Sequence, residues 1–293
     1  MRVLHLDSGR FFRGGQHQVL RLIEGLRAEG IESTLLARED SPLYLAACER
    51  GWKVEPLSLL RTLALARRHD LVHAHDARTH TFGAFIRSIP VVVSRRVAFA
   101  VRSRWKYQRA RRYLAVSGFV KSVLIAGGVP ANKIDVVYDG VPLLPQSSGT
   151  RIVAPADFDD PMKGAPLAME AARLAGVELL VSSNLERDLA DASMLVYISH
   201  SEGLGSAALF AMAAGVPVIT SHVGGLPEAV LDRETGLLVE NHPQAIAAAI
   251  RELTGDPALA RRLGRNARQA VAERFTVEHM VRRTMEVYRT VLS

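Results

Sequence analysis

Short, continuously apolar runs alternate with longer amphipathic segments from one end of the chain to the other. Ten such runs occur, and they are RVLHLD, STLLA, LVHAH, PVVVS, YLAVS, IDVVY, RIVAP, VELLVS, MLVYIS and VPVIT. Apolar runs of this length, separated by amphipathic segments, are typical of parallel strands that helices cover on both faces. The sequence therefore predicts an α/β fold with doubly wound parallel sheets.

A polar segment of small residues, QSSGT at 146–150, interrupts this alternation before a new apolar run begins. Such a break is typical of a domain boundary, which we place at about residue 147. The prediction is a first Rossmann-like domain over residues 1–147 and a second, smaller one over residues 148–293. The chain ends in helical patterns, and we expect the final helix, 276–293, to pack back on the first domain.

Cysteine content and hydropathy indicate the compartment. The chain has a single cysteine, Cys48, which excludes an internal disulfide framework. The N-terminal run is too short and wrongly flanked for a signal peptide, and no run approaches the length of a membrane-spanning helix. We therefore expect a cytoplasmic protein, at most peripheral on the inner face of the membrane.

Positive charge is concentrated in one segment. Residues 77–133 contain twelve Lys or Arg and no Asp or Glu. A block of this kind favours an anionic partner, and aromatic residues among the arginines suit a membrane interface, although a solvated basic helix is the competing interpretation. No nucleic-acid-binding motif accompanies it, so we expect no nucleic-acid partner. The residues assigned to acceptor or membrane binding are Arg95, Arg96, Arg102, Arg104, Trp105 and Lys106.

Three glycine turns follow predicted strands: Gly14-Gly15, Gly203 to Gly205, and Gly224-Gly225. In open α/β sheets, ligands bind beyond the carboxyl ends of the strands, where backbone amides at helix N-termini attract anions. None of the turns fits the glycine spacing of dinucleotide-binding proteins or of phosphate-loop NTPases. The pattern therefore indicates an anionic ligand but disfavours both of those classes.

In their order along the chain, these segments resemble the retaining GT-B glycosyltransferases of family four. The first domain resembles that family in RGGQHQVLRLIEGLRAEGIE (13–32), in DLVHAHDA (70–77) and in residues 113–141. PMKG (161–164) is similar to the lysine turn that opens the family's second domain. The most specific match is residues 201–239, which begin SEGLGSAALFAMAAGVPVIT.

The resemblance implies two Rossmann-like domains that face a cleft and an enzyme that transfers a sugar from a nucleotide-diphospho-sugar with retention of anomeric configuration. It also implies that no metal or other cofactor is needed. Lys163 would then pair with the donor phosphates and Glu202 with sugar hydroxyls, and we assign both, with His75, to catalysis. The other residues expected to bind the donor are Gly14, Gly15, Gly203, Leu204, Gly205, Gly224, Gly225 and Glu228.

Histidines cluster where a predicted strand ends: His73 and His75 precede Asp76, and His80 follows. A His-x-His pair without a spaced third histidine is weak evidence for zinc, so we predict no metal site. We place His75 near the cleft ahead of His73. A buried structural histidine is the competing interpretation.

The donor half departs from the family pattern. The family's second glutamate, which accepts hydrogen bonds from the ribose, is replaced by Phe210. An acidic segment, Asp157, Phe158, Asp159 and Asp160, stands where relatives carry an arginine, and the interval before residue 194 lacks about one βα unit. Arg96 occupies a position that is histidine in many relatives, and a guanidinium cannot act as a general base.

These observations lead to one function and one alternative. We predict a glycosyltransferase that acts on a lipid-linked or acidic acceptor of the cell envelope. The alternative is a non-catalytic relative that has lost part of the nucleotide site and serves as a binding or scaffold protein.

Overall fold

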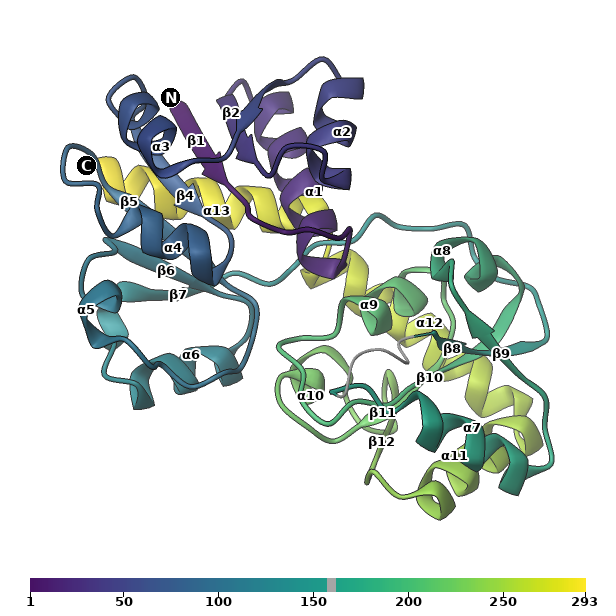
Figure 1. Ribbon diagram of the computed structural model, residues 1–293. Coiled ribbons are helices and arrows are strands. Elements are labelled where there is room, and N and C mark those ends of the chain that lie inside the picture. Colours follow the sequence, from purple (N-terminus) through teal and green to yellow (C-terminus); the bar gives the residue numbers. More distant parts are fainter. Residues whose placement is uncertain (157–161) are drawn as a thin grey trace. The chain divides into compact units, whose positions relative to one another are not determined.

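The computed structural model describes residues 1–156 and 162–293, which form two compact units (Figure 1). Unit 1 consists of Met1–Gly140 and Val277–Ser293, and unit 2 consists of Val141–Thr276. The division therefore falls after Gly140, earlier than the predicted boundary at about residue 147. The connecting segment belongs to unit 2 because Val141 forms a β-bridge with Thr276 and the Ser147 N–H donates to the carbonyl oxygen of Ala214.

Unit 1 is built on a sheet whose strand order is β3-β2-β1-β4-β5-β6-β7. Its strands are β1 Arg2–Leu6, β2 Glu32–Ala37, β3 Lys53–Pro56, β4 Leu71–Ala74, β5 Val91–Arg95, β6 Arg112–Ala115 and β7 Ile134–Val136. Neighbouring strands in this sheet run parallel. The apolar runs predicted six of these strands. The edge strand β3 was missed because its sequence, KVEP, has a single aliphatic residue and is only partly buried.

Helices connect these strands as a parallel sheet requires. They are α1 Gly14–Ala28, α2 Pro42–Glu49, α3 Leu59–Ala66, α4 Ala77–Gly83, α5 Arg104–Tyr107 and α6 Gly118–Ala126, with a short 3-10 turn, η1 Ala131–Lys133. Four of them begin at a side chain that accepts a backbone N–H from the first turn, and these caps are Ser41, Ser58, Asp76 and Ser117. Such caps satisfy donors that the helix leaves unpaired.

The C-terminal helix α13, Val277–Leu292, completes the core of unit 1. Its residues Met280, Val281 and Tyr288 pack with Val3 of β1 and Leu22 of α1. In Figure 1 this yellow helix lies among the elements formed by the N-terminal part of the chain. The last helix is therefore part of the first domain, although the whole of unit 2 separates them in sequence.

Gly25 allows α1 and α13 to approach closely, since a Cβ at this position would lie 2.4 Å from Cγ2 of Val281. Alanine inside a helix normally stabilises it by about 0.5–1 kcal/mol relative to glycine. We expect Gly25→Ala to destabilise unit 1 instead, by about 1–3 kcal/mol, because of this overlap. Urea unfolding measures the change, and Gly25→Ala combined with Val281→Ala should recover part of the loss. Stabilisation by Gly25→Ala alone would contradict the packing.

Unit 2 contains a smaller sheet with the order β12-β11-β10-β8-β9. Its strands are β8 Arg151–Pro155, β9 Leu179–Ser182, β10 Ala192–Tyr197, β11 Val218–Ser221 and β12 Gly236–Val239. Its helices are α7 Ala165–Ala175, α8 Leu185–Asp188, α9 Ser206–Ala213, α10 Leu226–Ala229, α11 Pro243–Gly255 and α12 Pro257–Arg274, with the 3-10 turn η2 Leu189–Asp191. Sheets of seven and five strands confirm the doubly wound α/β fold and the smaller second domain.

Small side chains let the helices of unit 2 lie close to the sheet. Ala168 and Ala171 of α7, and Ala247 of α11, are buried in one cluster with strand residues such as Val196.

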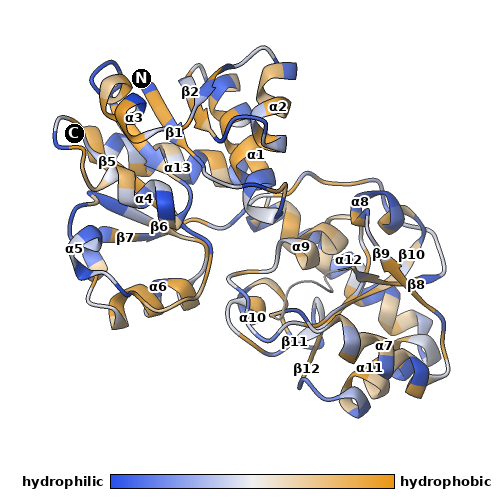
Figure 2. Ribbon diagram, in the orientation of Figure 1, coloured by the Kyte–Doolittle hydropathy of each residue, from blue (hydrophilic) through white to orange (hydrophobic). Residues whose placement is uncertain are grey.

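Figure 2 shows that hydrophobic residues follow β1 of unit 1, whereas α13 carries both hydrophobic and hydrophilic residues. In the two described ranges, no helix has the length and hydropathy needed to cross a membrane.

Candidate functional site

The strand order of unit 2 reverses between β8 and β10, and this is where open α/β sheets bind ligands. Lys163 follows β8 in sequence and forms an antiparallel bridge with Ser199, just beyond β10. The Gly164 N–H donates to the carbonyl oxygen of Ile198 at 2.9 Å, and the His200 N–H donates to that of Met162 at 2.8 Å. This backbone pairing fixes Lys163 beside the loop that carries Glu202.

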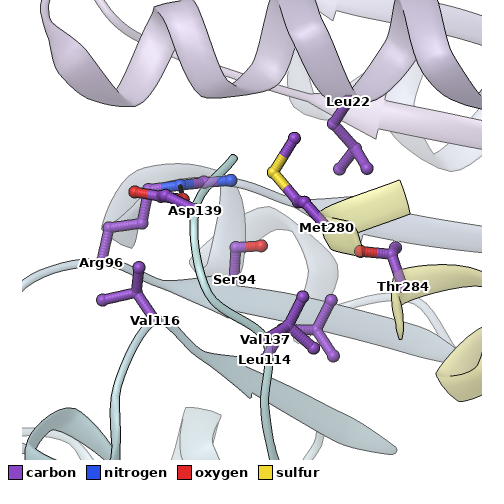
Figure 3. Close-up of a pocket in the computed structure, with 9 residues that line it drawn as sticks. All are labelled: Leu22, Ser94, Arg96, Leu114, Val116, Val137, Asp139, Met280 and Thr284. Carbon is purple, nitrogen blue, oxygen red and sulfur yellow. Dashed lines mark hydrogen bonds and ion pairs between the residues drawn. The ribbon is translucent and has the colours of Figure 1, made fainter. Parts of the chain in front are cut away.

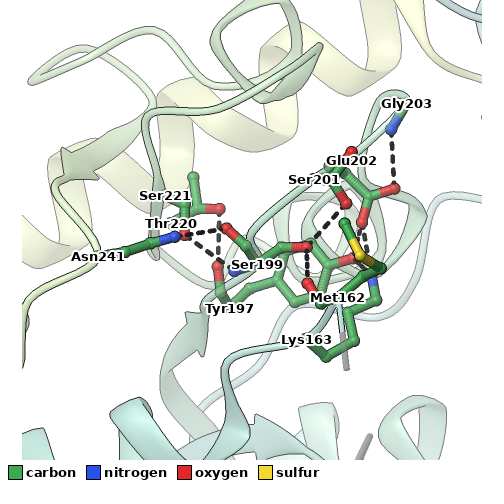
Figure 4. A network of polar contacts seen from close by, with 10 residues as sticks. All are labelled: Met162, Lys163, Tyr197, Ser199, Ser201, Glu202, Gly203, Thr220, Ser221 and Asn241. Atoms are coloured by element: carbon green, nitrogen blue, oxygen red, sulfur yellow. Dashed lines mark hydrogen bonds and ion pairs between the residues drawn. The ribbon is translucent and has the colours of Figure 1, made fainter. Parts of the chain in front are cut away.

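Lys163 and Glu202 form an ion pair at this edge of the sheet (Figure 4). The Lys163 Nζ lies 2.5 Å from Glu202 Oε2, and the hydroxyl of Tyr197 lies 2.5 Å from both atoms. The charged side chains are 18% and 17% exposed, so solvent reaches the pair only partly. One cation and one carboxylate are thus held within reach of a ligand at a partly desolvated position.

Two glycine turns support Glu202. Its carboxylate accepts the Gly203 N–H at 3.1 Å, and its carbonyl oxygen accepts the Gly225 N–H at 3.1 Å. Gly224 has a positive φ of 60°, and a Cβ there would lie 2.1 Å from the carbonyl oxygen of Glu202. The second glycine turn therefore positions the residue at the start of the first one.

We expect Gly224→Ala to displace Glu202, since the left-handed conformation alone costs a residue with a Cβ about 1–2 kcal/mol and the backbone overlap adds to this. The expected result is a destabilised unit 2 and weaker binding of any ligand held by Glu202. Thermal unfolding and ligand titration measure the two effects. Gly255→Ala is the matched control because a Cβ at Gly255 meets no atom within 4 Å. Equal behaviour of the two variants would show that Gly224 has no such role.

A polar network joins the ends of three neighbouring strands beneath this pair. Ser221 Oγ accepts the Ser199 N–H at 2.9 Å and donates to Asn241 Oδ1 at 2.5 Å, and Asn241 Nδ2 donates to the carbonyl oxygen of Ser199 at 2.9 Å (Figure 4). The sequence analysis missed Ser221 and Asn241. The available signal was their position at the ligand-binding edge, since Ser221 ends β11 and Asn241 lies two residues after the end of β12.

Unit 1 contains a buried cluster of three histidines, His5, His73 and His75. His5 on β1 stands opposite His73 on β4 in the strand register, and His5 Nδ1 lies 3.1 Å from His75 Nε2. The ring nitrogens of His73 lie 2.6 Å from the Tyr288 hydroxyl and 2.8 Å from Ser94 Oγ. The assumption that no third histidine accompanies the His-x-His pair is therefore wrong, because strand pairing supplies His5.

Burial sets the protonation state of this cluster. It lowers the pKa of His5 to about 3 and holds the pKa values of His73 and His75 well below the ordinary value. All three rings are therefore neutral near pH 7, and their nitrogens lie within 4.8 Å of one another. Neutral imidazole is the metal-binding form, but both nitrogens of His73 already contact protein hydroxyls. This geometry fits a hydrogen-bonded core better than a metal centre, and the absence of a metal site stays a prediction.

Two family models match the chain, one for each half of the fold. The model described as Glycosyltransferase Family 4 matches residues 12–143, and the model described as Glycosyl transferases group 1 matches residues 168–270. Together they cover well over half of the sequence. The chain belongs to the GT-B glycosyltransferases of family four. The two Rossmann-like units are the two domains that this fold requires.

Curated relatives match this chain over part of their length. A D-inositol 3-phosphate glycosyltransferase of Streptomyces avermitilis is 44% identical over 102 residues, which are 34% of this chain and 22% of that protein. An alpha-maltose-1-phosphate synthase of Mycolicibacterium smegmatis is 37% identical over 121 residues, 39% of this chain and 31% of that protein. The chain therefore matches less than a third of the length of each of these two relatives.

Solved structures match over the whole chain. Anabaena HepE, in complex with UDP and glucose, is 18% identical with a TM-score of 0.88, and the match covers 99% of this chain and 100% of that one. The lipopolysaccharide outer core galactosyltransferase WaaB is 13% identical with a TM-score of 0.76, over 99% and 100% of the two chains. These likenesses show that the complete fold is shared.

Unit 2 brings together most of the residues assigned to the donor. Lys163 and the glycines at 203, 224 and 225 all lie against Glu202, as described above. Gly205 has a φ of 102° and caps α9, the helix that carries the half-buried Phe210. Leu204 is buried, so its side chain packs in the core and does not face a ligand. Glu228 lies on α10, where its N–H donates to the carbonyl oxygen of Gly225.

The other assigned residues lie in unit 1 or outside the residues that the structure describes. Gly14 and Gly15 form the first turn of α1. His75 is buried against His5, so the structure favours the structural interpretation of this histidine over direct catalysis. The acidic residues of segment 157–160 lie outside the described residues.

The basic segment divides into inward and outward side chains. Arg95 is 8% exposed and donates to the carbonyl oxygen of Phe99, and Arg96 pairs with Asp139 at 2.9 Å beside a cavity of about 10 Å³ (Figure 3). These two arginines are therefore mostly covered and already paired within unit 1.

Of the six residues assigned to an acceptor or membrane, only three are exposed. Arg102 and Arg104 are exposed, and Trp105 is 44% exposed with its ring centroid 5.4 Å from that of Phe85. Lys106 is partly buried and donates to the carbonyl oxygen of Ala77 at 2.9 Å. The exposed surface assigned to an anionic partner thus reduces to Arg102, Arg104 and Trp105.

Proposed function

We propose that this glycosyltransferase transfers a sugar from a nucleotide-diphospho-sugar to a lipid-linked or acidic glycan acceptor of the cell envelope. The reaction retains the anomeric configuration, requires no metal, and takes place in the cytoplasm at the inner face of the membrane. The observation that carries the proposal is the partly exposed Lys163–Glu202 pair, held by glycine turns at the switch point of unit 2. A cation beside glycine turns at this edge is suited to a sugar diphosphate.

The chemistry explains the choice of residues. Glycosyl transfer passes through an oxocarbenium-like state while negative charge grows on the departing phosphate. A fixed cation lowers the barrier when it stands where that charge develops, and Lys163 provides it. Glu202 accepts hydrogen bonds from hydroxyl groups, which is the role we assign to it toward the sugar.

Related proteins support the donor and acceptor classes. HepE has been crystallised with UDP-glucose, and its chain is matched over its full length, so a fold of this compact size accommodates a nucleotide sugar in that protein. The matched structure of WaaB is described as a lipopolysaccharide outer core galactosyltransferase, and the Streptomyces avermitilis relative is named for a phosphorylated inositol. We extend these classes to this chain as part of the proposal.

The proposal is tested by a calorimetric and thermal-shift screen of the purified protein against UDP-, GDP- and ADP-sugars. Saturable binding of one class, followed by its transfer or slow hydrolysis, would support an enzyme and identify the donor. NMR of the anomeric proton in the product would test retention. If a well-folded sample binds none of the three classes, the proposed reaction fails.

Membrane association has its own test. We expect the protein to sediment with vesicles that contain anionic lipid and to do so less at high salt, since screening weakens surface attraction. Exchanging Arg102 and Arg104 for glutamate should lower the bound fraction several-fold. Exchanging two outward arginines of unit 2, Arg261 and Arg262, is the matched control. Equal sedimentation with neutral and anionic vesicles would remove the membrane from the proposal.

One observation favours the second candidate, a non-catalytic binding protein. Phe210 stands on α9 where the family has a carboxylate for the ribose, and phenylalanine cannot accept that hydrogen bond. The same screen separates the candidates, since the second predicts no donor turnover from a folded protein. Introducing the carboxylate as Phe210→Glu should strengthen nucleotide binding if the remaining site is intact.

A further inference from the structure

The hydroxyl group of Tyr197 forms the third corner of the Lys163–Glu202 pair. It lies 2.5 Å from Lys163 Nζ and 2.5 Å from Glu202 Oε2, while these two atoms are themselves 2.5 Å apart. Lys163 Nζ also lies 4.8 Å from the centroid of the Tyr197 ring. A phenolic O–H can donate to the carboxylate and accept from the ammonium at the same time.

The ring and the hydroxyl of Tyr197 have separate roles. Tyr197 is the last residue of β10, it is 4% exposed, and its carbonyl oxygen accepts the Thr220 hydroxyl at 2.8 Å. Phenylalanine would fill the same buried space in the strand. The ring therefore serves packing, and the hydroxyl adds hydrogen bonds to Lys163 and Glu202 at the ligand-binding edge.

In the structure, the charge of Lys163 is taken up by Glu202. A phosphate that binds to Lys163 must share the ammonium with that carboxylate or replace it. Replacement would leave Glu202 partly buried beside a new anion, and a partly buried carboxylate that loses its donors is costly. Two donors stay in place when Lys163 turns away: the Gly203 N–H on Oε1 and the Tyr197 hydroxyl on Oε2.

Resting on the function proposed above, we propose that Tyr197 is a positioning residue for the donor phosphate: its hydroxyl keeps Glu202 in place when Lys163 exchanges that carboxylate for a phosphate oxygen. Lys163 then moves from the Glu202 carboxylate to the phosphate oxygen while Glu202 stays in place. Tyr197 itself has no contact with the sugar or the phosphate.

The test uses UDP as the probe and Tyr197→Phe as the variant. Removing a hydrogen bond to a charged group should weaken UDP binding about tenfold, which corresponds to about 1.4 kcal/mol. Binding of uridine, which has no phosphate, should change less than about twofold. With a UDP-sugar that is turned over, donor KM should rise while kcat changes little, because the hydroxyl serves binding in the ground and transition states alike.

Two controls separate this role from a structural one. Tyr44→Phe removes a hydroxyl from unit 1 and should leave UDP binding unchanged. In a Glu202→Gln background the charge that Tyr197 stabilises is gone, so Tyr197→Phe should then cost less than about twofold. Thermal unfolding of each variant verifies that it folds.

The outcomes are distinct. Coupled losses in the double-mutant cycle support the positioning role. Additive losses, or equal losses for UDP and uridine, show that the hydroxyl only maintains the fold and overturn it. Unchanged UDP binding in Tyr197→Phe, with normal binding by the wild type, overturns the inference alone. Failure of the wild-type protein to bind UDP and every nucleotide sugar overturns the proposed function and this inference with it.

Discussion

Replacement of Lys163 by alanine is expected to lower sugar transfer by about 10²–10³-fold, the loss typical when one preorganised group is removed from developing negative charge. Donor affinity should fall as well, because the same ammonium neutralises the ground-state diphosphate. The variant also removes the ammonium that pairs with Glu202, so this carboxylate then repels the incoming diphosphate. Steady-state kinetics with the donor identified by the screen, together with calorimetric titration, measure both losses.

Lys53→Ala provides the matched control. Lys53 is an exposed lysine on the edge strand β3 of unit 1, and its loss removes the same charge from the protein without touching the pair at the end of β10. It should retain wild-type kinetics. If Lys163→Ala kept even a third of wild-type turnover, Lys163 would not be the group that stabilises the leaving phosphate.

Unit 1 is expected to lose stability steeply as the pH falls below about 6.5. Burial lowers the pKa of four histidines in the folded state, which are His5, His73, His75 and His80. The pKa values of His5 and His80 fall to about 3. In the unfolded chain they titrate near 6.5, so below that pH the unfolded state binds more protons than the folded one. Their contribution is present above the unfolded value and is lost as the pH falls.

The size of the effect follows from proton linkage. Each such histidine adds a slope that approaches about 1.4 kcal/mol per pH unit once the pH is well below 6.5. Urea unfolding at pH 7.5, 6.5 and 5.5 measures it, and tryptophan fluorescence reports on unit 1 because Trp52 and Trp105, the two tryptophans of the chain, both lie there.

His5→Gln should reduce the acid slope by about one histidine's share, whereas His242→Gln, at an exposed position in unit 2, should leave it unchanged. A slope that is the same in both variants, or stability of unit 1 that does not vary between pH 7.5 and 5.5, would contradict the neutral buried cluster.

The strands of both sheets could be predicted where the sequence alone encodes burial. The ten apolar runs correspond to ten strands because a strand covered on both faces must be apolar throughout. The two missed strands, β3 and β12, lie at the edges of their sheets and are short. β3, with the sequence KVEP, has a single aliphatic residue and carries a weak signal, whereas β12, with the sequence GLLV, is apolar but only four residues long.

The candidate site was predictable where it rests on backbone requirements. The glycine turns at 203–205 and 224–225 stand out because positive φ angles and close backbone approach exclude other residues, as Gly224 shows against Glu202. Lys163 and Glu202 were found through the family resemblance. In the sequence, Tyr197 is one residue of an apolar run, and no pattern along the chain indicates that its hydroxyl reaches Lys163 and Glu202.

The sequence by itself determined the fold class and the residues of the glycine turns, because burial of strands and the backbone freedom of glycine are local properties. Its ordered motifs carried the resemblance to the family. Only the tertiary structure decided which distant side chains meet. It joined His5 to His73 through strand register, drew Arg95 and Arg96 inward to internal acceptors, and placed the last helix on the first domain. Each of these depends on which element lies next to which, and that follows from packing the whole chain, not from any segment of it.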